Sequence, residues 1–154
     1  MTSNMPGKND GFTLIEIMVV VVIVAILSAI AVPTYKDYVI RSKITQAISG
    51  LSAVQVRMEQ CYQDNHSYKP ASGKDCCERV DVSALTKNFE YFKFSCDASS
   101  ATTFLLTAEG IDQLSGFKYA VNQADTRSTE ITGASGWAVH SPNNCWVTRK
   151  DGTC

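Results

Sequence analysis

An apolar run close to the N-terminus constrains this chain more than any other feature. From Phe12 to Val32 every residue is apolar except Thr13, Glu16 and Ser28. At a rise of 1.5 Å per residue, a helix over this run would be about 31 Å long, which matches the hydrocarbon core of a bilayer. A carboxylate there costs about 2.5–3.5 kcal/mol at the membrane centre and less near an end. The run therefore predicts a membrane-spanning helix in which Glu16 is either compensated or used.

Simpler interpretations of the run explain only part of it. A secretory signal peptide would use Ala29-Ile30-Ala31 as its cleavage site, but the run is longer than an ordinary signal core and Glu16 interrupts it. The basic region before it consists of Lys8 alone, and Asp10 follows at once. A plain membrane anchor explains the length and leaves Glu16 unexplained. A soluble surface helix fails because residues 17–26 have no polar face.

The residues around Glu16 carry a family resemblance. The stretch Gly11-Phe12-Thr13-Leu14-Ile15-Glu16, followed by the apolar segment and Pro33, resembles the processing site of type IV prepilins. The resemblance to pilins in general extends from Gly11 to about Met58. A second stretch, Phe94–Cys154, is similar to PilE-type minor pilins through "FSC", "TFLLTAEG", "YAVNQADTRST" and "CWVTRKDGTC".

This resemblance implies a role for each residue of the motif. A prepilin peptidase would cut between Gly11 and Phe12 and methylate the new amine of Phe12. Glycine at the cut lets the protease approach the backbone closely. Glu16 would pair with the cationic N-terminal amine of a neighbouring subunit inside a filament, so that its burial is costly until the partner arrives. We therefore expect a change at Glu16 to damage assembly more than folding.

The helix is expected to continue beyond the apolar run as the spine of a globular head. Pro33 removes one hydrogen bond and should kink or loosen the helix near Ala29. Gly50 should cost up to about 1 kcal/mol and mark a slight bend. The turn formers Asp64-Asn65 should follow the helix end. Beyond Tyr35, apolar residues at helical spacing predict a buried stripe: Ile40, Ile44, Ala47 or Ile48, Leu51, Val54 and Met58.

These signals predict three parts and an α+β fold. Residues 1–11 would be a leader peptide and 12–62 one long helix, with 12–32 as membrane or filament core and 33–62 as the amphipathic spine. Residues 63–154 would form a head with a small antiparallel sheet packed on the helix, as in the type IV pilin fold. We expect a loop at 66–77 and one short helical turn within 78–88. Strands are expected at 89–96, 102–108 and 117–122, with a weaker one near Ala138 or Trp146-Val147.

Six cysteines behind a membrane-targeting segment indicate disulfides formed in an oxidising compartment: Cys61, Cys76, Cys77, Cys96, Cys145 and Cys154. The turn signal Asp151-Gly152 and the disulfide-bounded C-terminal loop of the family both indicate a Cys145–Cys154 pair. Cys96 is expected to pair with Cys76 or Cys77, and Cys61 with the one that remains. The sequence has no C-x-x-C, and its two histidines lie far apart, so neither a metal nor a cofactor is expected.

Outside the motif, the residues that could take part in catalysis lack the other elements of a catalytic site. His140, Ser141 and Asp151 come without a nucleophile elbow or a Gly-rich oxyanion loop, so an enzyme is not expected. Arg127, Arg149 and Lys150 could form a basic patch that touches DNA. A net charge of −1 favours a solvated face or a contact with a neighbouring subunit instead. Trp137 and Trp146 are expected to pack on the sheet.

The sequence thus indicates a structural minor subunit of a type IV pilus. Its expected partners are other pilin subunits, prepilin peptidase, the inner-membrane assembly machinery and, before assembly, membrane lipid. It would span the bacterial inner membrane once and then enter an extracellular filament that serves pilus biogenesis, twitching motility, adhesion or DNA uptake. DNA itself is a partner without support from the sequence.

Two alternatives stay open. A type II secretion pseudopilin shares the same N-terminus. Major pseudopilins of that system usually close the C-terminal region with calcium-ligating acidic residues, and Asp151 is the one acidic residue between Cys145 and Cys154. A secreted or membrane-tethered binding module would need a different cleavage site or no assembly at all.

Overall fold

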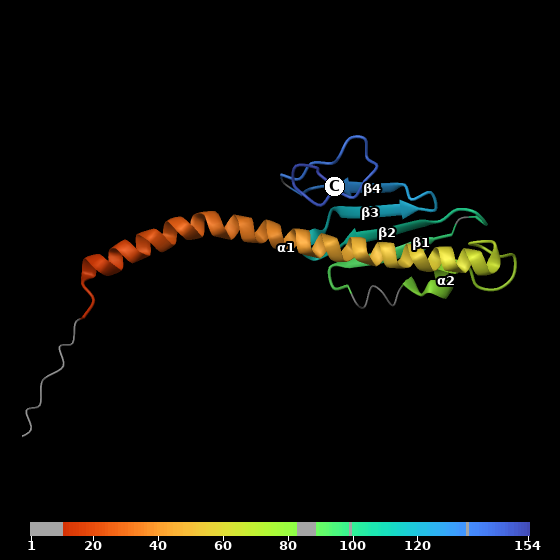
Figure 1. Cartoon of the computed structure of the whole chain (residues 1–154), viewed down its shortest axis with the longest axis horizontal. Coiled ribbons are helices and arrows are strands. Elements are labelled where there is room, and N and C mark those ends of the chain that lie inside the picture. The colour runs from red at the N-terminus through yellow and green to blue at the C-terminus, as the bar shows by residue number, and fades with distance from the viewer. Residues whose placement is uncertain (1–10, 83–88, 99, 135) are drawn as a thin grey trace, which may run out of the picture. The chain divides into compact units, whose positions relative to one another are not determined.

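A computed structural model of the chain describes residues 11–82, 89–98, 100–134 and 136–154 (Figure 1). Its elements are α1 (Leu14–Asn65), α2 (Cys76–Val80), β1 (Phe92–Asp97), β2 (Leu105–Gly110), the 3₁₀ helix η1 (Asp112–Leu114), β3 (Phe117–Asn122) and β4 (Arg127–Ile131). The chain divides into two compact units, Met1–Tyr38 and Val39–Cys154, and α1 belongs to both.

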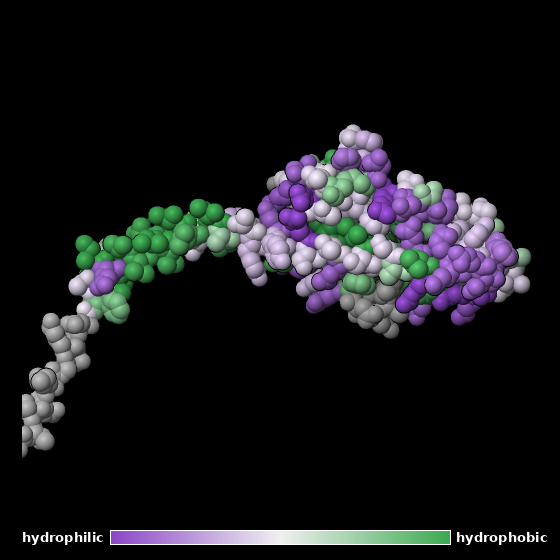
Figure 2. Space-filling model, in the orientation of Figure 1, coloured by the Kyte–Doolittle hydropathy of each residue, from purple (hydrophilic) through white to green (hydrophobic). Residues whose placement is uncertain are grey.

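The first unit is the apolar part of α1. Every side chain from Phe12 to Val32 is exposed, and an 18-residue window of α1 reaches a mean hydropathy of 3.0 with none of it buried. Figure 2 shows this surface as a nearly continuous hydrophobic stretch. By length and composition this helix is apolar enough to cross a membrane. Its side chains therefore need lipid or another protein around them.

Pro33 lies inside α1 without ending it. A proline cannot donate the hydrogen bond that the Ala29 carbonyl would receive in a regular helix. One residue later, the Thr34 hydroxyl donates to the carbonyl oxygens of Ile30 at 2.5 Å and Ala31 at 3.3 Å. The Thr34 hydroxyl thus gives hydrogen bonds to two carbonyls in the turn before the proline. The helix near Ala29, which was expected to kink or loosen, stays helical.

The second half of α1 buries the predicted stripe. Its buried residues are Ile44, Ala47, Gly50, Leu51, Val54 and Met58, while Ile40 and Ile48 are partly buried. Gly50 is part of the stripe because the sheet approaches it closely. A Cβ built at Gly50 would lie 2.6 Å from Cζ of Phe94 and 3.2 Å from a ring carbon of Phe89. Glycine has a low helix propensity, but at position 50 its lack of a side chain leaves the space that the rings of Phe94 and Phe89 occupy.

α1 ends three residues later than expected, and the turn formers are its last turn rather than its stop signal. The Asn65 side-chain amide donates to the Cys61 carbonyl at 2.8 Å and so satisfies one acceptor of the helix end. His66 follows in the left-handed region with φ 52°, and its N–H donates to the Tyr62 carbonyl. This is the left-handed cap that commonly ends helices.

The sheet is a four-stranded antiparallel meander in the order β1-β2-β3-β4. It confirms the expected strands at 117–122 and, with shifted ends, at 89–96 and 102–108. β4 was not expected. It pairs with β3 in a register that places Tyr119 opposite Thr129. The weaker strand expected near Ala138 or Trp146-Val147 was wrong, because both segments are irregular.

The core lies between α1 and the sheet, as the yellow part of α1 running along the strands in Figure 1 shows. Buried residues of α1, β1, β2 and β3 form one cluster with Trp146 of the C-terminal segment. The short helix expected within 78–88 begins earlier, at Cys76, because Asp75 caps it and accepts a hydrogen bond from Glu78 N at 2.9 Å. Residues 83–88 lie outside the described residues.

Three disulfides join the parts of the head. Cys61 at the end of α1 is bonded to Cys76, and Cys77 is bonded to Cys96 in β1. This is one of the two arrangements that the sequence left open. Cys145 is bonded to Cys154. α2 is therefore tied covalently to the long helix on one side and to the sheet on the other.

The C-terminal segment attaches to the sheet through side chains instead of a strand ladder. The fully buried Thr129 donates from Oγ1 to the Cys145 carbonyl at 2.8 Å and accepts from Val147 N at 3.0 Å. The Tyr119 hydroxyl donates to the Val147 carbonyl at 3.0 Å, and burial raises the pKa of Tyr119. Trp146 Nε1 donates to the Ala120 carbonyl at 2.9 Å.

Replacing Thr129 with valine is expected to lower the free energy of unfolding of the head by about 2 kcal/mol. Valine keeps the shape but leaves a buried N–H and a buried carbonyl without their partner. Urea unfolding of the full chain in mild detergent, followed by tryptophan fluorescence, measures the change. Thr45→Val is the matched control, because the Thr45 hydroxyl binds the Arg41 carbonyl on an exposed face of α1. Equal effects of the two variants would contradict the role of Thr129.

Candidate functional site

The start of α1 brings the predicted processing and assembly residues together. Thr13 precedes the first helical residue, and its Oγ1 accepts from Glu16 N at 3.3 Å. The Glu16 carboxylate reaches back to Thr13 N and Thr13 Oγ1, both at 3.4 Å. This reciprocal pair is a capping box, in which two free N–H groups of the helix start find partners. The Thr-x-x-Glu spacing of a capping box is present in the sequence, and this local role of Glu16 was not predicted.

The peptide bond before Phe12 is open. Gly11 and Phe12 are both exposed, and a Cβ built at Gly11 would meet nothing within 4 Å. Among the described residues, none lies close enough to that position to block approach to the bond. Glu16 is exposed in this single chain and lies among apolar neighbours, with Thr13 as its local hydrogen-bond partner. The exposed carboxylate oxygens can also accept hydrogen bonds from a cationic group of another molecule.

The basic patch expected from Arg127, Arg149 and Lys150 is largely offset by acidic neighbours. Arg127 makes an ion pair with Asp125 at 3.0 Å, and its guanidinium lies 4.6 Å from the centroid of the Trp146 ring. Trp146 is therefore the stacking surface of an arginine as well as a core residue.

Arg149 and Lys150 lie in the turn of the C-terminal loop, next to Asp151. Gly152 N donates to the Arg149 carbonyl at 3.1 Å, which closes the turn that Asp151-Gly152 predicted. Hydrogen bonds from Thr153, helped by the charge of Arg149, hold the pKa of Asp151 below its usual range. The carboxylate thus stays ionised beside the two basic residues and lowers their attraction for phosphate.

A second site with two arginines was not expected from the sequence. The end of α1 and α2 enclose a shallow pocket of about 350 Å³, here called the α1–α2 pocket, which is lined by Arg57, Gln60, Cys61, Asp64, Asn65, Arg79 and Val80. Arg79 is oriented by a hydrogen bond from its Nε to the Lys74 carbonyl at 2.9 Å. The Cys61–Cys76 disulfide fixes the two helices that carry the guanidinium groups. The pocket therefore combines two cations, two amides and one carboxylate on a rigid support.

The loop between the two helices carries two further cations. Lys69 and Lys74 are both exposed on it. The buried Tyr68 anchors the loop, because its N–H donates to the Ala101 carbonyl at 2.8 Å and its hydroxyl donates to Glu59 at 2.7 Å. Burial, with the hydrogen bond to Glu59, raises the pKa of Tyr68. The loop thus presents two lysines from a fixed base.

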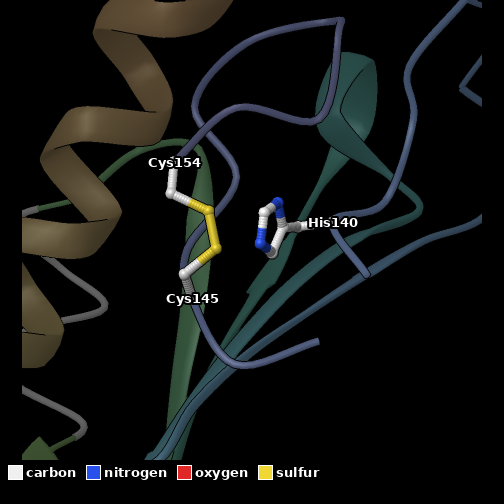
Figure 3. A group of neighbouring side chains, drawn as sticks. All are labelled: His140, Cys145 and Cys154. Carbon is white, nitrogen blue, oxygen red and sulfur yellow. A yellow bond between two sulfur atoms is a disulfide. The ribbon is translucent and has the colours of Figure 1, made fainter. Parts of the chain in front are cut away.

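His140 does not assemble a hydrolase site with Ser141 and Asp151. Figure 3 shows its imidazole beside the Cys145–Cys154 disulfide, while the Asp151 carboxylate accepts a hydrogen bond from Thr153 N at 3.0 Å. His140, Cys145 and Cys154 each offer a ligand atom within 4.8 Å of the others. The two sulfurs are bonded to each other, so neither is a thiolate that could ligate a metal in this oxidised form.

Two known families match successive parts of the chain between residues 7 and 124. Residues 33–124 match the family described as type IV minor pilin ComP, DNA uptake sequence receptor. Residues 7–32 match the prokaryotic N-terminal methylation motif. The second match covers the motif on which the sequence resemblance was based.

Individual relatives are fimbrial proteins. A probable minor fimbrial protein of Dichelobacter nodosus is 24% identical over 147 residues, which is 95% of this chain and 85% of the relative. The type IV major fimbrial protein FimA of the same organism is 40% identical over 72 residues, and a fimbrial protein of Pseudomonas aeruginosa is 53% identical over 49. The chain spans 43% and 32% of the lengths of these last two.

A solved structure shares the fold. The non-core minor pilin PilV of Neisseria meningitidis superimposes with a TM-score of 0.51 at 16% sequence identity. The match covers 64% of this chain and 94% of that one. The long helix packed on a four-stranded antiparallel sheet is thus the fold of a type IV pilin.

Proposed function

The chain belongs to the family of the type IV minor pilin ComP, the DNA uptake sequence receptor, and from that premise we propose that it is a DNA-binding minor subunit of a type IV pilus. The family match over residues 33–124 carries this proposal, because it covers the end of α1, the α1–α2 loop and most of the sheet. The family is one of structural pilins, so the activity proposed is binding and assembly. Twitching motility and adhesion are further roles that such a filament would serve.

The N-terminal residues support assembly. The exposed Gly11–Phe12 bond would be cut by prepilin peptidase, and the new amine of Phe12 would be methylated. Methylation keeps the positive charge of the amine, so Glu16 of one subunit can pair with it in the next. Before assembly the apolar part of α1 would sit in the inner membrane, and in the filament it would pack against equivalent helices.

The α1–α2 pocket is the part of the head that we propose as the DNA contact. Arginine donates two parallel hydrogen bonds to a phosphate, and Arg57 and Arg79 line one shallow, open hollow of suitable size. Lys69 and Lys74 would extend the contact along the backbone of the nucleic acid. Contacts of this kind position DNA and give affinity, while base contacts give specificity.

The double variant Arg57→Gln/Arg79→Gln is expected to bind duplex DNA about tenfold more weakly at moderate salt. Two phosphate contacts would be lost, and the slope of log affinity against log salt would fall by roughly 2. Fluorescence anisotropy with a labelled duplex and the full chain in neutral detergent measures both quantities. Glutamine keeps the length and polarity of the side chains, so the fold should be retained.

Two comparison variants locate the contact. Arg41→Gln removes an equivalent charge from an exposed position of α1 and should change affinity little. Arg149→Gln/Lys150→Gln tests the turn that the sequence indicated. If that variant loses affinity and the pocket variant does not, the DNA contact lies on the C-terminal loop. If none of the variants changes an observed affinity, the pocket assignment is wrong, and if the wild type does not bind, DNA binding itself is refuted.

A deletion strain separates the proposed function from the type II secretion alternative. We expect reduced uptake of DNA with secretion intact, since the family match is to a pilin. Loss of secretion with normal pili would overturn the assignment. Complementation with the pocket variant should restore pili but not DNA uptake.

A further inference from the structure

The face of the sheet that points away from α1 is accessible, and neither the assembly motif nor the proposed DNA contact uses it. Along β1, β2 and β3, residues that face the core alternate with residues that are exposed or half-buried. The strand register aligns these outer residues in three rows across the sheet. The rows combine charged, small polar and apolar side chains, so the face has the mixed chemistry of a contact surface.

One row alternates in charge from strand to strand. Lys93 of β1 lies beside Glu109 of β2. Lys118 of β3 lies beside Glu109 on one side and beside Glu130 of β4 on the other. The Lys118 ammonium is 3.8 Å from the Glu130 carboxylate, and these side chains keep 44% and 66% of their surface exposed. Lys93 and Glu109 are exposed as well, so this row, here called the charge ladder, presents its charges to another molecule.

The row beside the charge ladder runs through the middle of the face and consists of small side chains: Ser95, Thr107, Ala120 and Ser128. The hydroxyls of Ser95 and Thr107 are hydrogen-bonded to each other. In the third row, Leu105 adds an apolar side chain that is 47% exposed. Small side chains in the middle of the face let a second sheet approach closely, which pairing of the ladder with other charges requires.

We propose that this face binds the same face of a second copy of the chain through a twofold axis parallel to the strands. Such an axis lays β1 of one copy over β4 of the other, and β2 over β3. Lys93 then faces Glu130 of the other copy, and Glu109 faces Lys118, with each pair formed twice. The charge ladder is therefore complementary to itself, as a contact between identical surfaces must be.

A twofold axis across the strands does not give this match. It would lay each strand over its own copy, so that along the ladder Lys93 would meet Lys93 and Glu109 would meet Glu109. The axis along the strands also suits the long helix, because the second half of α1 runs along the strands (Figure 1). This part of α1 then points the same way in both copies. Both chains enter the dimer from the same end, as two copies inserted in one membrane must.

The size of the face predicts a weak contact. Four strands of about five residues cover roughly 350 Å² per copy, from a strand spacing of about 4.8 Å and a rise of about 3.4 Å. A standard interface buries about 800 Å² on each partner. We therefore expect a dimer that forms only when copies are concentrated and that salt weakens, because the ladder lies at the surface. It does not depend on DNA binding, since Arg57 and Arg79 lie on helices.

Sedimentation equilibrium of the full chain in a neutral detergent of matched density measures the dimer dissociation constant. Glu109→Lys places two lysines opposite each other across the axis, twice per dimer, and should weaken the dimer about tenfold or more. Adding Lys118→Glu restores opposite charges across the axis. The variant Glu109→Lys/Lys118→Glu should therefore return to within about threefold of the wild type.

The double variant separates a contact between copies from ion pairs within one sheet. Within the chain, Glu109→Lys creates two like-charged neighbour pairs along the ladder, and Glu109→Lys/Lys118→Glu also has two, at its two ends. Recovery of the dimer in the double variant therefore cannot come from recovery of the sheet. Near-ultraviolet circular dichroism shows whether both variants keep the folded head.

Glu78→Lys is the matched control, because it makes the same charge change at an exposed position of α2. It should leave the dissociation constant unchanged. A wild type that stays monomeric would overturn the proposal. Association that is equal in all four proteins would do so too, because it would place the contact on the apolar part of α1. A double variant as weak as Glu109→Lys would show that the ladder acts only within its own sheet.

Discussion

Glu16→Gln is expected to yield a subunit that is processed and folded but at least tenfold depleted from sheared filaments. Glutamine can replace glutamate in a capping box, so the start of α1 should remain intact. It cannot supply the negative charge that would compensate the N-terminal amine of a neighbour in an apolar filament core. Quantitative immunoblots of filament and membrane fractions measure the ratio, and the intact mass shows whether the mature chain starts at a methylated Phe12.

Thr13→Val separates the two roles of Glu16. It removes the hydroxyl that accepts from Glu16 N and so opens the capping box, but it keeps the carboxylate. We expect about 1 kcal/mol of local helix stability to be lost, with filament incorporation close to that of the wild type. If Thr13→Val blocks assembly as fully as Glu16→Gln, the cap is what the filament requires and the charge pair is refuted.

Gly116→Ala is expected to destabilise the head by about 3 kcal/mol, the largest effect of a single added methyl group among the described residues. Gly116 has φ 99°, where a side chain costs about 1–2 kcal/mol. A Cβ there would also lie 1.9 Å from the carbonyl oxygen of Thr132, the residue directly after β4, whose N–H donates to the Gly116 carbonyl at 2.9 Å. The β3–β4 pair must separate at this end to admit it.

Gly133→Ala separates the cost of placing a side chain at a positive φ from the cost of the steric clash. Gly133 has φ 73°, but a Cβ on it would meet nothing within 4 Å. It should therefore cost only the conformational part, about 1 kcal/mol. Thermal unfolding of both variants in the same detergent, followed by near-ultraviolet circular dichroism, gives the difference. Similar melting temperatures of the two variants would mean that β3 and β4 separate at little cost in free energy. The close approach at Gly116 would then not constrain the residue at this position.

Sequence predicted the elements whose burial follows a regular period. The stripe from Ile44 to Met58 repeats every three or four residues, so its buried face could be read directly. β3 alternates buried and half-buried residues, and its bounds matched. β4 has the sequence Arg-Ser-Thr-Glu-Ile, in which the one fully buried side chain, Thr129, is polar. Its burial depends on carbonyl and amide partners that lie 16 and 18 residues away, so no local pattern announces it.

Contacts between residues far apart in the sequence also explain why the strand predicted at Trp146-Val147 was wrong. An aromatic and a β-branched residue signalled burial correctly, since both are buried. They contact the sheet through Tyr119, Ala120 and Thr129 instead of pairing as a strand. For the candidate site, the N-terminal motif is local and was readable. The α1–α2 pocket joins Arg57 and Arg79 through folding, and only the three-dimensional structure brings them together.

The β4 edge of the sheet bears on how copies of this protein can join. An unpaired strand edge is a template onto which another copy can add its own strand, and subunits proposed to stand side by side in a filament meet at high local concentration. On β4 the outward Thr129 N–H is already bound to the Asn143 side chain at 2.8 Å, and Cys145 and Val147 occupy its hydroxyl. The C-terminal segment therefore covers β4 at Thr129, and a strand of another copy cannot pair with β4 there unless this segment moves away.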